Sequence, residues 1–87
     1  MIKRFTELFE VLSQPGNVKA NCNTFTVVNS GVTIISLNGY DLGPGDQYTS
    51  PGNIDELNES IYTIAFPAAT GTYILIRKSY SDASYSR

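Results

Sequence analysis

Four short runs of strand-forming residues dominate the sequence after residue 23. They are rich in Val, Ile, Thr, Tyr and Phe, and clusters of Gly, Pro, Asn and Ser separate them. The runs cover residues 24–28, 32–37, 60–66 and 72–80. Several short strands at this spacing predict a mainly β domain, here a small antiparallel β-sandwich or a jelly-roll-like barrel.

The residues between these runs predict how the strands are joined. Asn38-Gly39 is typical of a two-residue β-hairpin, because both central positions of a type I′ turn need positive φ. Residues 29–31 predict a tight reversal between the first two runs. Residues 68–71 predict a further hairpin between the last two runs.

The N-terminal segment has a different pattern, with apolar residues three and four positions apart. These residues are Ile2, Phe5, Leu8, Phe9 and Leu12. Residues at these spacings share one face of a helix, so the pattern predicts a short amphipathic helix that ends before Pro15. We therefore expect a helical arm at residues 1–16, a single β domain at 17–80 that begins with an extended connector, and a tail at 81–87.

Both faces of the predicted strand at residues 72–80 are apolar. Tyr73 and Leu75 point to one side of an extended chain, and Ile74 and Ile76 point to the other. A sheet with one face in water would alternate cleanly between apolar and polar residues. The second face is therefore expected to meet another sheet, the N-terminal helix or a neighbouring subunit, and cover from outside the chain is the simplest account.

Composition argues against several classes of function. The net charge is −2 and the six Lys and Arg residues form no stripe, so no nucleic-acid partner is expected. No apolar run approaches the roughly 20 residues of a transmembrane helix. The chain lacks histidine, the usual catalytic base and a common zinc ligand, so we expect no enzyme, no catalytic residues, no metal and no cofactor. Cys22, the only cysteine, is expected to pack as a small apolar residue.

Residues 43–58 form the segment best suited to bind a ligand. They contain two Pro-Gly dipeptides and predict a long ordered loop around a short strand at 47–49. Tyr48 in this loop supports an alternative function, a small module that binds a glycan or a protein ligand. A calcium site is a further alternative for the oxygen ligands of this region, although their spacing matches no EF-hand: Asp41, Asp46, Asn53 and Asp55.

The stretch from residue 29 to residue 80 resembles small β-sandwich structural proteins of bacteriophage virions, on the basis of three segments. The segments are residues 32–39 (VTIISLNG), 42–46 (LGPGD) and 73–80 (YILIRKSY). The resemblance implies a capsid-associated subunit, such as a minor capsid, vertex, decoration or spike-base protein, assembled in the host cytoplasm and located in the virion. It implies no particular functional residue.

The leading hypothesis is therefore a virion structural subunit that self-associates and docks onto other capsid proteins. Aromatic and apolar side chains are typical of such interfaces. The residues expected there are Ile2, Phe5, Leu8, Phe9, Leu12, Tyr48, Tyr73, Leu75 and Tyr80.

Overall fold

A computed structural model describes residues 3–82, and these residues form eight β-strands and no helix. The described part of the chain therefore holds no helix long and apolar enough to cross a membrane. The strands are β1 (Lys3–Leu12), β2 (Gly16–Lys19), β3 (Thr24–Asn29), β4 (Ile35–Leu37), β5 (Tyr40–Leu42), β6 (Gln47–Ser50), β7 (Ile61–Ala65) and β8 (Tyr73–Asp82).

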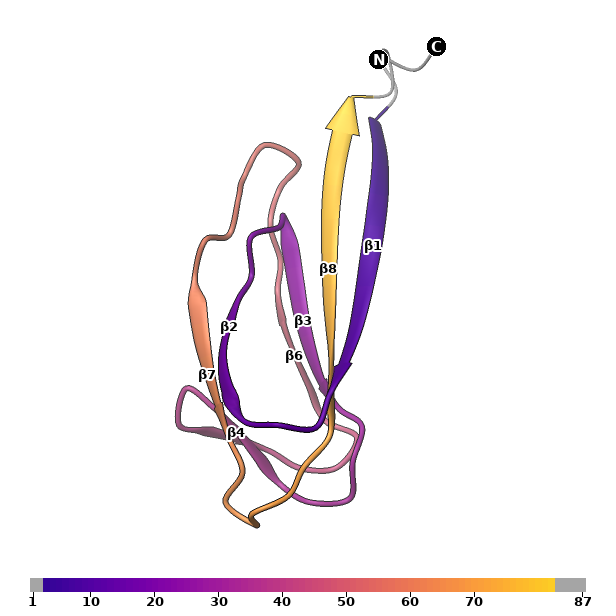
Figure 1. Ribbon diagram of the computed structural model, residues 1–87. Coiled ribbons are helices and arrows are strands. Elements are labelled where there is room, and N and C mark those ends of the chain that lie inside the picture. Colours follow the sequence, from indigo (N-terminus) through magenta and orange to yellow (C-terminus); the bar gives the residue numbers. More distant parts are fainter. Residues whose placement is uncertain (1–2, 83–87) are drawn as a thin grey trace.

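The strands form two antiparallel sheets of four strands each (Figure 1). One sheet has the order β1-β8-β3-β6, and the other has the order β2-β7-β4-β5. Strands from the two halves of the chain thus pair in a nested way, β1 with β8, β2 with β7, β3 with β6 and β4 with β5. The prediction of a mainly β, antiparallel fold is confirmed.

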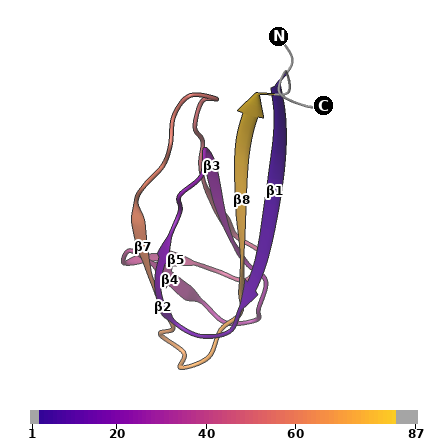
Figure 2. The ribbon, with the colours of Figure 1, turned by 45° about the horizontal axis from the view of Figure 1, so that its top comes forward.

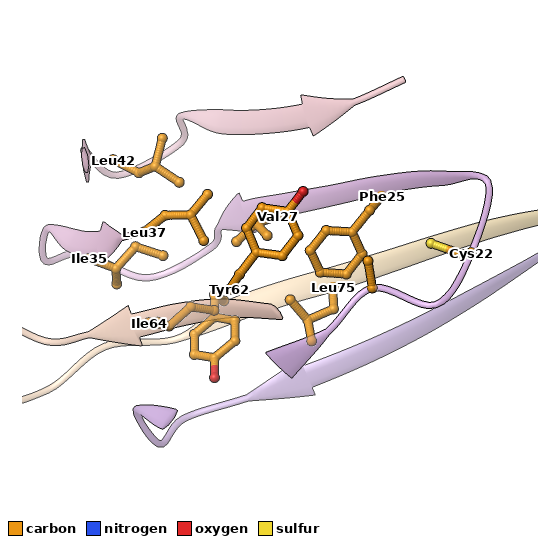
Figure 3. Close-up of a cluster of buried hydrophobic side chains, with 11 residues drawn as sticks. Cys22, Phe25, Val27, Ile35, Leu37, Leu42, Tyr62, Ile64 and Leu75 are labelled. Atoms are coloured by element: carbon orange, nitrogen blue, oxygen red, sulfur yellow. The ribbon is translucent and has the colours of Figure 1, made fainter. Parts of the chain in front are cut away.

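The two sheets enclose one hydrophobic core (Figure 3). On β3, Phe25 and Val27 are fully buried while the residues between them are only partly buried, as alternation along a strand requires. The other buried apolar residues come from both sheets and the segment after β2: Ala20, Cys22, Ile35, Leu37, Leu42, Tyr62, Ile64, Tyr73 and Leu75. The chain therefore supplies both layers of this core itself.

The predicted N-terminal helix is wrong, because this segment is strand β1. It pairs residue for residue with β8 along its whole length. The apolar residues therefore divide between two faces, with Phe5 and Phe9 on one and Leu8 and Leu12 on the other. Pairing with β8 at ten positions stabilises the strand more than a short apolar stripe would stabilise a helix of only a few turns. β1 thus belongs to the β domain and is not a separate arm, and Ile2 lies outside the described residues.

The turn predictions are partly confirmed. The hairpin between β4 and β5 has φ values of 50° at Asn38 and 85° at Gly39, as the sequence predicts. The reversal at residues 29–31 and the turn at 68–71 exist, but each leads from a strand in one sheet to a strand in the other and so closes no hairpin. Turn residues indicate a change of direction, and they do not tell which sheet receives the next strand.

Most strand boundaries lie close to the predicted runs. β3, β7 and β8 begin within one residue of their runs, and β6 matches the short strand expected in the loop. β4 is shorter than its run. β2 lies in the predicted connector, and β8 continues to Asp82, inside the predicted tail.

Candidate functional site

The outer face of the sheet β1-β8-β3-β6 carries a group of apolar side chains that are exposed or only half-buried. We call this group the outer patch, and its members are Phe5, Phe9, Val11, Val28, Ile74, Ile76 and Tyr80. The register places them in neighbouring rows, because Phe9 lies opposite Ile76 and Val11 lies opposite Ile74. The β1 members are the most accessible, with Phe5, Phe9 and Val11 exposed by 53%, 60% and 65%.

One cation orders the aromatic end of the outer patch. The Lys78 Nζ atom lies 4.2 Å from the centre of the Phe5 ring and 5.3 Å from that of Tyr80. The two rings meet edge to face, with centroids 6.2 Å apart. Cation–π and edge-to-face contacts of this kind hold side chains in place at exposed positions. The patch is therefore a defined surface and not a set of unrelated exposed residues.

The outer patch extends onto a projecting ribbon. Pairing between β3 and β8 stops at Thr24 and Lys78, so residues 3–6 and 79–82 pair only with each other. Figures 1 and 2 show these ends of β1 and β8 reaching past β3. An isolated two-stranded ribbon is marginally stable in water. Contacts with another protein would therefore stabilise this ribbon more than they would stabilise the rest of the sheet.

The structure keeps several of the predicted interface residues at the surface. Phe5, Phe9 and Tyr80 belong to the outer patch. Leu8 is 62% exposed but lies on the opposite face of β1, and Leu12 is partly buried against the core. The prediction therefore brought together side chains from both faces of β1, only one of which carries the patch.

Two predicted interface residues are wrong, and four patch residues were missed. Tyr73 and Leu75 are 1% and 0% exposed in the core of the chain itself, so neither is available to a partner. The missed residues point to the same side of their strands as Phe5, Phe9 and Tyr80. Period-two alternation identifies them once β1 is known to pair with β8: Val11, Val28, Ile74 and Ile76.

A second candidate site is a cleft of about 390 Å³ lined by Leu37, Asn38, Tyr40, Tyr48 and Tyr62. The Tyr48 and Tyr62 rings are 6.1 Å apart, and the buried face of Tyr62 stacks on Phe25. Aromatic walls and a few polar groups are typical of ligand sites. Of the predicted loop at 43–58, Tyr48 reaches this cleft.

The Tyr62 hydroxyl is held by polar neighbours. Burial raises the pKa of the Tyr62 phenol, but hydrogen bonds from several neighbouring groups, that from Asn58 first among them, outweigh it and lower the pKa overall. The Asn58 amide nitrogen lies 3.1 Å from the Tyr62 hydroxyl oxygen and 3.1 Å from Ser50 Oγ. This network fixes the ring that forms the inner wall of the cleft.

The alternative of a calcium site finds no support in residues 3–82. In that range, no three Asp, Glu, His or Cys side chains lie close enough together to hold a metal ion. The carboxylate of Asp46 instead accepts a hydrogen bond from the Gly43 backbone N–H at 3.0 Å. Asp46 thus closes its own turn.

Cys22 is a core residue, as predicted, and we expect its thiol not to react in the folded protein. It is 1% exposed, and burial raises the pKa of the thiol against the opposing effects of the Arg77 charge and a backbone hydrogen bond from Lys78. At pH 8, iodoacetamide should modify Cys22 rapidly in denaturant and at a negligible rate without it. Equal rates in the two conditions would show that the thiol is accessible.

No protein-family model and no curated protein matches this chain. Among solved structures, the chain is similar to the solution NMR structure of a de novo designed double-stranded β-helix. The sequence identity is 18% and the TM-score is 0.47, over 87% of this chain and 99% of that chain. A likeness this weak says nothing of function.

Proposed function

We propose that this chain is a structural subunit of a virion and that it works by associating with further copies of itself and with other capsid proteins. The outer patch carries the proposal. Phe5, Phe9 and Val11 are each more than half exposed on one face of an ordered strand. Large apolar patches are uncommon on monomeric proteins and mark surfaces that bind other proteins. In this one, the Glu7 and Lys78 row lies between the Phe5 and Tyr80 pair and the other members.

The strand order supports a finer description of the fold. We propose that the two sheets form a jelly roll, because the orders β1-β8-β3-β6 and β2-β7-β4-β5 place all eight strands in nested antiparallel pairs. Viral capsid proteins use this architecture, and so do lectins. Since a fold alone does not define a function, the proposal of a structural role is based on the outer patch and not on the strand order.

We expect Phe9→Lys to weaken self-association by at least about tenfold, the effect of roughly 1.4 kcal/mol. The substitution replaces a central aromatic side chain of the patch with a charge that must lose its water in any interface. Sedimentation equilibrium of the full chain measures the dissociation constant.

The matched control for Phe9→Lys is Ile61→Lys. Ile61 is 61% exposed, against 60% for Phe9, but it faces outward from β7 on the other sheet. The control should associate like the wild type. A wild-type chain that stays monomeric up to its solubility limit, or equal effects of the two substitutions, would contradict the proposal.

The virion location has its own test. Particles purified from the producing organism should contain the chain in a fixed ratio to the major shell protein, and imaging should show it within the shell. Recovery of the chain only as free protein, with none in the particles, would reject this location.

The tyrosine cleft favours a second candidate function, the binding of a glycan. In that case, Tyr48→Ala should weaken binding to arrayed oligosaccharides by about fivefold, since one aromatic wall contributes about 1 kcal/mol. Gln47→Ala is the control, because Gln47 lies on the same strand but faces away from the cleft. Sedimentation should be unchanged in both variants. If the wild type binds no oligosaccharide, this second function is rejected.

A further inference from the structure

Strand β1 is the longest edge strand in the part of the molecule that the structure describes. It has ten residues, and no strand within residues 3–82 pairs with its outer edge. The other edge strands, β2, β5 and β6, have four, three and four residues. Proteins usually protect long edges with proline, a bulge, charged side chains or a covering segment. β1 contains no proline and its register with β8 is unbroken, but four of its ten residues are charged.

We propose that β1 pairs antiparallel with β1 of a second copy of this chain, with Glu7 of both copies at a two-fold axis perpendicular to the sheet. The inference rests on the proposed function, because it specifies how two copies associate. The two sheets β1-β8-β3-β6 join into one sheet of eight strands. Backbone hydrogen bonds then satisfy an edge that otherwise depends on water.

Side-chain alternation and charge select this register. Residues that face each other across the axis must point to the same side of the joined sheet, so odd positions face odd positions and even face even. With Glu7 at the axis, Phe5 of one copy faces Phe9 of the other. Arg4 then faces Glu10, whose carboxylate lies 2.9 Å from Arg77 of its own chain and would be shared between the two cations. Aromatic pairs and opposite charges directly across two strands both stabilise a sheet.

The neighbouring registers lose both matches. An axis at Thr6 places Phe5 opposite Glu7 of the second copy, and an axis at Leu8 places Phe9 opposite Glu7. Both shifts also leave Arg4 opposite a leucine, where its charge has no partner. Charge complementarity and apolar matching therefore identify a second copy of β1 as the partner of this edge.

The two Glu7 side chains that meet at the axis repel each other, and the Lys78 charge beside each of them offsets this repulsion. Lys78 lies opposite Glu7 on β8, so the row across the joined sheet runs Lys78, Glu7, Glu7, Lys78. Positive and negative charges are equal in this row. On either side of it, the outer patch of one copy continues into that of the other through the facing Phe5 and Phe9 rings.

Single cysteines on β1 measure the register directly. Facing Cα atoms on antiparallel strands are about 4.5–5.5 Å apart, which is within the range of about 4.4–6.8 Å that a disulfide spans. Glu7→Cys should therefore form a disulfide-linked dimer quickly under mild oxidation. In Thr6→Cys and Leu8→Cys, each thiol would face a residue two positions from its own counterpart, roughly 8 Å away, beyond disulfide reach.

The experiment oxidises the wild-type chain and these three variants with oxidised glutathione and compares dimer formation on non-reducing gels. Glu7, Thr6 and Leu8 are all exposed, so the substitutions should not disturb folding, and the wild type controls for Cys22. Fastest cross-linking by Glu7→Cys supports the proposal. Fastest cross-linking by either other variant overturns the register.

Two further outcomes separate this inference from the proposed function. If no variant cross-links while the wild type sediments as a dimer, edge pairing is wrong and self-association through another surface stands. If the wild type sediments as a monomer at every concentration, both the edge pairing and the self-association in the proposed function are rejected.

Discussion

We expect Leu75→Ala to lower the free energy of unfolding by about 2–5 kcal/mol. Leu75 lies on β8 in the centre of its sheet and is fully buried in the core that the two sheets share. The substitution removes apolar contacts with both sheets and leaves a cavity that the rigid strands fill only in part. Urea unfolding followed by circular dichroism measures the loss, at a protein concentration at which every variant is a monomer.

Leu8→Ala is the control for Leu75→Ala, because it makes the same chemical change on the strand paired with β8. Leu8 is 62% exposed, so its loss should change the free energy of unfolding by no more than about 0.5 kcal/mol. Comparable losses in the two variants would mean that Leu8 is buried in solution. That result would contradict the exposed position of Leu8 in the structure.

β3, β4, β7 and β8 could be predicted because each buries alternate residues in the core. β3, for example, alternates buried Phe25 and Val27 with partly buried neighbours. β1 could not be predicted in the same way, since its outer face has no cover within the described chain. Glu7 interrupts the apolar residues on one of its faces, and Glu10 interrupts those on the other. The apolar residues between and beside these charges lie three and four positions apart, the spacing that is typical of a helix.

The sequence correctly indicated that β8 is apolar on both faces, but it did not tell which face remains open. The second sheet of the same chain covers Leu75, and Ile76 stays on the outer face. This choice depends on the pairing of β8 between β1 and β3, which joins segments far apart in the chain. The candidate site was therefore predicted as a set of residue types and not as a surface.

Long-range polar contacts were beyond sequence reasoning. Buried Asn23 donates from its amide to the backbone carbonyls of Asn53, Ile54 and Glu56, and its side-chain oxygen accepts a hydrogen bond from the Tyr80 N–H at 2.8 Å. One side chain thus ties the loop before β7 to the last strand. An asparagine in a polar connector gives no local sign of such partners.

The second large loss of stability is expected where the loop before β7 contacts Asn23, the residue that precedes β3. A Cβ atom at Gly52 would lie 1.9 Å from the Asn23 carbonyl oxygen, a backbone atom that no rotamer change can move. Gly52→Ala should therefore push the loop away from Asn23 and lower the free energy of unfolding by about 3 kcal/mol, at the upper end of overpacking effects. Gly43→Ala is the control, since its Cβ would meet only the flexible Asp46 side chain, at 3.2 Å, and should cost less than about 1 kcal/mol. Equal urea midpoints for the two variants would show that the loop does not rest on Asn23 in solution.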